Sequence, residues 1–85
     1  MPRLSPFPSF VRLVAILPHI MQITLNGQLT ATAALTLLDM IIEQGFVPEA
    51  VIAEVNFELI KRDRWQQHLL QDGDTVELLS FVGGG

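Results

Sequence analysis

The sequence predicts a small α+β domain: a mixed sheet of four to five strands with one main helix packed on one face. Three observations lead to this prediction. Strand-like alternation occurs at both ends of the region after residue 20, a segment of helical period lies between them, and an Asn-Gly pair marks a tight turn. The chain has 85 residues, 49% of them hydrophobic and none of them cysteine, so we expect one core that forms without disulfides.

A β-hairpin is expected first. Residues 21–26 (MQITLN) alternate between apolar and polar side chains, as in a half-buried strand. Asn26-Gly27 follows, and both positions tolerate the positive φ angles of a two-residue hairpin turn. Residues 28–32 (QLTAT) return as a second strand, and we expect Leu29 and Ala31 to face the core.

A helix over about residues 37–44 follows the hairpin. Thr36, with Asp39 three residues later, forms a variant of the capping box ahead of an apolar run. The residues that recur at helical spacing and are expected to face the sheet are Leu37, Leu38, Ile41 and Ile42. Gly45 fits the position just after the helix, and Pro48 prevents its continuation.

Three further strands complete the order of elements. Residues 50–56 (AVIAEVN) and 58–60 (ELI) predict a third strand and a short fourth, and residues 61–70 an irregular connection. Asp72-Gly73 supplies a turn, and residues 75–82 predict the last strand. The first and last strands are the most apolar, which favours them as neighbours at the sheet centre. This order matches the β-grasp, or ubiquitin-like, fold.

The chain divides into three parts by composition. Residues 1–20 hold four of the five prolines, Arg3 and Arg12 but no acid, and their apolar run is too short to span a bilayer. This N-terminal extension is interpreted in three ways: an extra strand, a flexible arm, or sequence translated upstream of a natural start at Met21. We favour the last two together. The β-grasp domain is expected over 21–82, and a flexible glycine tail over 83–85.

Charge excludes one class of partner. Residues 21–85 contain three basic and nine acidic side chains, a net charge of −6. An acidic domain repels phosphate backbones, so nucleic acid is a poor candidate partner, whereas a basic protein surface would attract it. The same excess of acid can also serve solubility alone.

Few side chains suggest catalysis. His19 and His68 lack neighbouring ligands at metal spacing, and Asp72 and Asp74 flank a glycine as turn residues do. Residues 61–64 (KRDR) are interpreted as a solvated loop, with a docking patch as the second choice. Trp65 is interpreted as the residue that pins this loop to the core. The absence of cysteine excludes a thiolate metal site or nucleophile. We therefore expect a protein that is not itself an enzyme and binds neither cofactor nor metal.

The last five residues, FVGGG, carry the strongest functional signal. Three glycines follow directly on an apolar strand, and glycine lets another backbone approach closely because it lacks Cβ. We expect Gly83 and Gly84 to thread into a partner and to present the carboxylate of Gly85. The natural chemistry of such a group is activation by ATP to an acyl-adenylate, with the catalytic groups supplied by the partner.

Three segments, MQITLNG, AEVN and LQDGDTVELLSFVGGG, resemble the ThiS family of sulfur carrier proteins in thiamine-thiazole biosynthesis. The resemblance implies that a ThiF-like adenylyltransferase uses ATP to adenylate Gly85. A sulfur donor protein then supplies sulfur for a thiocarboxylate, and a ThiG-like thiazole synthase accepts it. We also expect a cytoplasmic protein, with neither membrane nor nucleic acid among its partners. One departure is Phe57, where many members have glycine; either this turn differs or Asn56 takes the left-handed position.

Two alternatives to a thiazole-pathway carrier remain open. The first is a MoaD-like or other carrier that delivers sulfur to a different product. The second is a plain β-grasp interaction module whose tail is inert. Beside the tail, Glu77, Leu79 and Phe81 are expected to form a docking surface if the helix covers Val76, Leu78 and Ser80, unless the N-terminal arm or the curvature of the domain covers that face.

Overall fold

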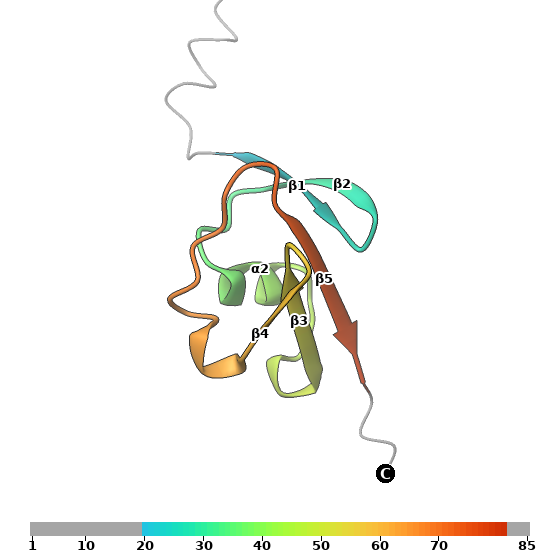
Figure 1. The fold of residues 1–85 in the computed structure, drawn as a ribbon, viewed down its shortest axis with the longest axis vertical. Coiled ribbons are helices and arrows are strands. Elements are labelled where there is room, and N and C mark those ends of the chain that lie inside the picture. The colour runs from blue at the N-terminus through green and yellow to red at the C-terminus, as the bar shows by residue number, and fades with distance from the viewer. Residues whose placement is uncertain (1–19, 82–85) are drawn as a thin grey trace, which may run out of the picture.

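The computed structural model describes residues 20–81, which fold into one mixed five-stranded sheet with a helix on one face (Figure 1). The strands are β1 (Met21–Leu25), β2 (Gln28–Thr32), β3 (Val51–Val55), β4 (Glu58–Ile60) and β5 (Thr75–Ser80). The helical elements are α2 (Leu37–Glu43) and two 3₁₀ turns, η1 (Pro48–Ala50) and η2 (Arg62–Arg64). The predicted α+β class and the β-grasp order of elements are confirmed.

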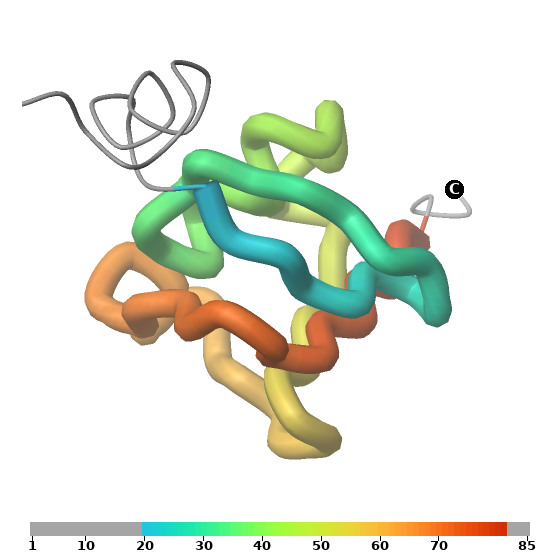
Figure 2. The backbone as a smooth tube through the Cα atoms, turned by 90° about the horizontal axis from the view of Figure 1, so that it is seen from above, coloured from blue at the N-terminus to red at the C-terminus, as the bar shows by residue number. Residues whose placement is uncertain are grey.

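The strand order is β2-β1-β5-β3-β4, so β5 lies at the centre of the sheet. It pairs with β1 in parallel and with β3 antiparallel. Figure 2 shows β1 between β2 and β5, as predicted from the apolar character of the first and last strands. The strand that leads to the glycine tail is therefore held on both sides.

Helix α2 has the two caps that its sequence predicts. The Thr36 hydroxyl accepts a hydrogen bond from the Asp39 amide at 3.1 Å, which satisfies one of the free amides of the first turn. At the other end Gly45 has a φ of +82°, and the amides of Gly45 and Phe46 donate to the carbonyls of Ile42 and Ile41. This pair of bonds is a Schellman motif, which ends the helix at the predicted place.

The predicted apolar face of α2 is partly wrong. Leu37 and Ile41 are fully buried as expected, but the third fully buried side chain is Met40, and Ile42 is 57% exposed. A helix of seven residues has only two turns, so its buried stripe is the narrow set i, i+3, i+4 that begins at Leu37. Ile42 falls outside this stripe and faces solvent.

Strand β2 forms over the predicted residues, but the prediction of which of its side chains face the core is wrong. Leu29 is 71% exposed and Ala31 is also exposed, whereas Thr32 is buried. The two-residue turn pairs Leu25 with Gln28, and this register places Leu29 opposite Thr24. Cross-strand partners share a face, so Leu29 lies on the side of the sheet away from α2.

The irregular segment between β4 and β5 completes the core. Trp65 is 2% exposed, and its indole Nε1–H donates to the carbonyl of Ile60 at 2.8 Å. The backbone carbonyl of Trp65 accepts from the Leu38 amide, and that of His68 accepts from the Leu37 amide. Trp65 therefore pins this segment against α2, which confirms its predicted structural role.

Two asparagines fasten β5 to its neighbours. Asn26 and Asn56 both have positive φ, at 48° and 51°, in the turns that follow β1 and β3. The Asn26 amide side chain accepts from the Leu78 amide at 2.8 Å and donates to the Leu78 carbonyl at 3.2 Å. The Asn56 side chain accepts from the Thr75 amide at 2.9 Å and donates to Asp74 at 3.0 Å. Each side chain extends the pairing of its strand along β5.

Candidate functional site: the outer face of the sheet and the base of the tail

The chain leaves the sheet at Phe81. Ser80 pairs with Val51, and the Phe81 amide donates to the carbonyl of Ala50 at 2.8 Å. Backbone pairing with β3 and η1 thus continues to the last described residue. The predicted tail residues Gly83, Gly84 and Gly85 lie outside the described residues, as does Val82.

The other predicted site residues lie together on the outer face, which we define as the side of the sheet away from α2. Glu77 and Leu79 are exposed there, while Val76 and Leu78 of the same strand are buried beneath α2. Ser80 was expected to be covered as well but is exposed. Phe81 follows with 46% of its surface exposed.

Strand β3 contributes two residues to the same face that the sequence interpretation did not assign to the site. Ile52 pairs with Leu79 across the sheet, and Glu54 pairs with Glu77. Ile52 is 44% exposed, although it is aliphatic and lies in a central part of the sheet. The alternation in residues 50–56 already placed Ile52 and Glu54 on one side, but only the register with β5 shows that they adjoin Leu79 and Glu77.

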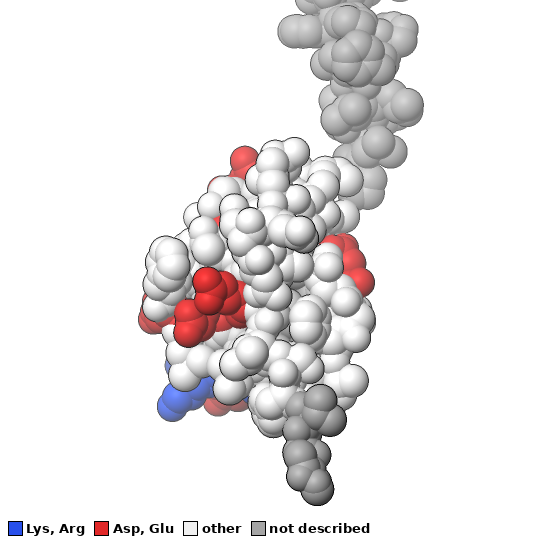
Figure 3. Space-filling model, turned by 90° about the vertical axis from the view of Figure 1, so that its right-hand side faces the viewer, with Lys and Arg blue, Asp and Glu red and all other residues white. Residues whose placement is uncertain are grey.

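These side chains surround an open hollow of about 370 Å³. Its lining residues are Asn26, Ile52, Glu54, Glu77, Leu78 and Leu79. Figure 3 shows this side of the molecule as mostly uncharged surface with a compact acidic patch. Two carboxylates that face one another across a sheet repel. An apolar surface with paired acids is suited to a protein partner that brings apolar and basic groups.

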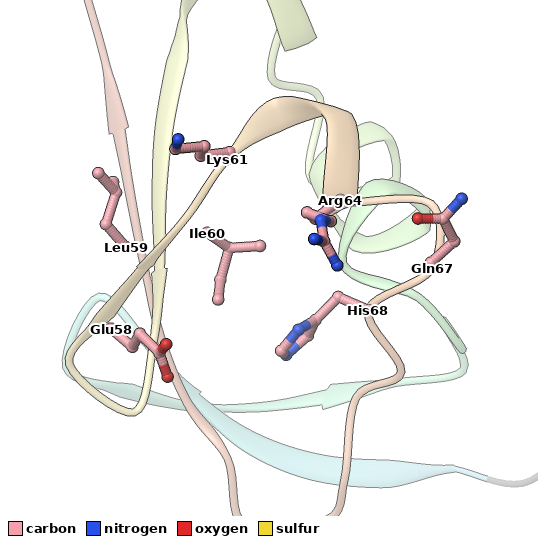
Figure 4. A pocket seen from close by; sticks show the side chains of 7 residues that line it. All are labelled: Glu58, Leu59, Ile60, Lys61, Arg64, Gln67 and His68. Atoms are coloured by element: carbon pink, nitrogen blue, oxygen red, sulfur yellow. The ribbon is translucent and has the colours of Figure 1, made fainter.

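A second hollow, of about 480 Å³, lies between β4 and the segment that follows it (Figure 4). It is lined by Glu58, Leu59, Ile60, Lys61, Arg64, Gln67 and His68, and the side chains of Arg64 and His68 extend into the same space. Arg62 pairs with Glu49 at 3.4 Å, but both side chains are more than half exposed, so the pair contributes little stability. The predicted solvated loop at 61–64 agrees with this exposure.

The remaining polar candidates are structural. The Asp72 carboxylate accepts from the Gln22 amide at 2.7 Å, and the Asp74 carboxylate accepts from the Gln71 amide at 2.8 Å. Both therefore hold the turn before β5, as predicted. Among residues 20–81, no group of three or more His, Asp or Glu side chains could hold a metal ion, and His19 lies outside this range. None of the helices in the same range is long and apolar enough to cross a bilayer.

The fold and the site together define a class of protein. A five-stranded β-grasp sheet holds its central strand on both sides, and that strand leads into a glycine tail beside an exposed apolar and acidic face. These are the features of a ubiquitin-like β-grasp protein. Comparison with known proteins identifies the family.

The ThiS family model matches residues 22–85, and the chain belongs to the ThiS family. It is 35% identical over 66 residues to the sulfur carrier protein ThiS of Escherichia coli, a match that covers 76% of this chain and all of that protein. The crystal structure of the thiamine biosynthesis protein ThiS from Geobacter metallireducens superposes with a TM-score of 0.65 at 30% identity, covering 76% of this chain and all of that one.

A longer protein also matches. The chain is 38% identical over 66 residues to a thiazole synthase of Magnetococcus marinus, across 76% of this chain. The match spans only 20% of the length of that synthase. A segment similar to this domain thus occurs within a chain named for thiazole synthesis.

Proposed function

We propose that this chain is a sulfur carrier whose Gly85 carboxylate becomes a thiocarboxylate that donates sulfur for thiazole formation in thiamine biosynthesis. The observation that carries the proposal is the family match, which runs through the glycine tail to residue 85. The described structure supports it, because β5 is anchored by two neighbours and backbone pairing continues to Phe81. The domain can thus present the glycines from a fixed base.

The chemistry has three steps, all at one carboxyl group. The Gly85 carboxylate attacks the α-phosphorus of ATP, and pyrophosphate leaves. A persulfide sulfur of a donor protein attacks the acyl-adenylate and displaces AMP, which gives an acyl disulfide. A thiol then cleaves the S–S bond, is itself oxidised to a disulfide, and leaves the thiocarboxylate on Gly85. The chain supplies the acyl group, and the partner binds ATP and supplies the catalytic groups.

The outer face is proposed to dock the activating partner, a ThiF-like adenylyltransferase. Glu77, Leu79 and Phe81 lie directly before the tail, so a protein that contacts them also receives the glycines. Ile52 and Glu54 widen the surface on the β3 side. The need for ATP in this step favours the cytoplasm as the compartment.

A ThiG-like thiazole synthase is the proposed sulfur acceptor. The matches to thiazole synthases, in which a related segment forms part of the longer chain, support this choice over another sulfur-accepting pathway. A carrier for a different product would share the tail chemistry. The two are distinguished by mixing the sulfur-loaded carrier with the thiazole synthase: a thiazole-pathway carrier transfers its sulfur to the synthase reaction, and a carrier for a different product does not.

Pyrophosphate exchange tests the activation step. The wild-type chain, mixed with the ThiF-like enzyme, ATP and labelled pyrophosphate, should support incorporation of label into ATP. A variant that lacks Gly85 should support none while its circular dichroism spectrum stays unchanged. Equal exchange with both chains would refute the assignment of Gly85, and an inert interaction module would support exchange in neither case.

A further inference from the structure

The turn between β3 and β4 is strained at an aromatic residue. Val55 pairs with Glu58, so Asn56 and Phe57 alone form the loop, with φ angles of 51° and 68°. Both angles are positive, as in a type I′ turn. Asparagine visits this region readily, whereas a bulky aromatic residue there is a conformational outlier. Glycine at position 57 would adopt the same backbone without strain.

The backbone strain at Phe57 is not offset by burial of its ring. Its side chain is 80% exposed, the largest exposed fraction among the large apolar residues of the described chain. The hydrogen bonds that organise the turn belong to Asn56, which contacts Asp74 and Thr75. Stability of the domain therefore favours glycine at position 57. Because neither burial nor a hydrogen bond of the side chain compensates the strain at Phe57, a role in recognition is the natural hypothesis.

The outer face continues from the tail to this turn. Leu59 pairs with Glu54, which pairs with Glu77, so these three form one row across the sheet. Leu59 is 59% exposed and stands two residues after Phe57. The turn adjoins the start of β5, where the Asn56 amide donates to the Thr75 carbonyl at 2.7 Å. β5 runs six residues from there toward the tail, a length of about 20 Å.

We propose that Phe57 is an anchor residue that inserts its ring into an apolar pocket of the adenylating enzyme that activates the tail. This inference rests on the proposed function and extends the docking surface over the full length of the outer face. The partner covers the sheet from Phe81 at one end to Phe57 at the other. Aromatic side chains that fill a pocket of the partner are among the few residues that dominate binding energy at interfaces.

Three variants test the inference. Phe57→Gly removes both the ring and the strain, Phe57→Tyr keeps the ring, and Ile42→Ala truncates an exposed apolar side chain on α2, on the opposite side of the sheet. Each is measured for its melting temperature and for its affinity for the ThiF-like enzyme by calorimetry. Phe57→Gly should raise Tm by about 5 °C and raise Kd at least about tenfold. Phe57→Tyr and Ile42→Ala should stay within about threefold of wild type in Kd.

A higher Tm together with a higher Kd for Phe57→Gly identifies Phe57 as an anchor. If Phe57 had only a structural role, a replacement that stabilises the fold would not weaken binding. An unchanged Kd for Phe57→Gly, or the same loss with Ile42→Ala, would overturn the inference. So would a wild-type chain that does not bind the enzyme. Thiocarboxylate formation by the wild type separates this result from the proposed function: formation together with an unchanged Kd for Phe57→Gly rejects the anchor alone.

Discussion

At the scale of single residues, Asn26 and Asn56 each have two tasks. Each accepts a positive φ that closes a two-residue turn, and each uses its amide side chain to bond to β5 or the residue before it. Glycine would fulfil the first task and not the second. The sequence indicated the turn at Asn26-Gly27, but the side-chain bonds to β5 depend on contacts 52 residues away that no local pattern reveals.

Substitution of Asn26 separates these two tasks. Asn26→Gly keeps the turn conformation and removes both bonds to Leu78, so we expect a loss of about 1–2 kcal/mol in the free energy of unfolding. Asn26→Ala removes the same bonds and adds left-handed strain, which should cost about 1 kcal/mol more. Urea denaturation of both variants measures the difference. Equal stability of Asn26→Gly and wild type would show that the side-chain bonds contribute nothing.

At the scale of elements, the sequence predicted the strands and the helix more accurately than it predicted which of their residues face the core. Alternation, turn chemistry and the caps of α2 are local signals, and the strands and helix follow them. Which side chains of a strand face the core depends on the register in which the strand pairs with its neighbour. The two-residue turn pairs Leu25 with Gln28, and this alone turns Leu29 outward against its hydrophobicity. The exposed Leu29 and Ile42 show that apolar character cannot by itself identify the buried side of so short an element.

The cap of α2 gives a test at the same scale. Thr36→Ala removes the acceptor of the Asp39 amide and should lower the free energy of unfolding by about 1 kcal/mol. Thr36→Ser keeps an oxygen at the same place and should lose less than half of that. Thermal unfolding followed by circular dichroism compares the two. Similar losses in both variants would assign the role of Thr36 to its methyl group and not to its hydroxyl.

The outer face of the sheet makes a separate prediction for docking. Glu77→Lys combined with Phe81→Ala should raise Kd for the ThiF-like enzyme about a hundredfold, because the pair loses a charge contact and an apolar contact beside the tail. Asp39→Lys combined with Ile42→Ala makes the same kinds of change on α2, on the opposite side of the sheet, and should shift Kd by less than about fivefold. Surface plasmon resonance measures both. Equal losses would indicate that net charge, and not the outer face, controls association.

At the scale of the whole molecule, the described domain fixes β5, the strand that leads to the glycine tail. Strand β5 is paired on both sides, Trp65 fixes the long connection that leads to β5, and the Phe81 amide bonds to Ala50 at the exit from the sheet. The sequence predicted this arrangement in outline, since it placed one of the two most apolar strands directly before the glycines. It could not predict that Ile52 and Glu54 adjoin Leu79 and Glu77 or that Phe57 has a positive φ, because these features follow from strand register and backbone conformation.

Intact-protein mass spectrometry can test directly whether the Gly85 carboxyl group carries sulfur. The wild-type chain is incubated with the ThiF-like enzyme, ATP and a persulfide donor, and a variant without Gly85 is treated identically. We predict that the wild type gains the mass of one oxygen replaced by sulfur, that fragmentation places the change at Gly85, and that the variant gains nothing. An unchanged wild-type mass in the presence of an active enzyme, or sulfur at any other residue, would show that Gly85 is not the sulfur-carrying group.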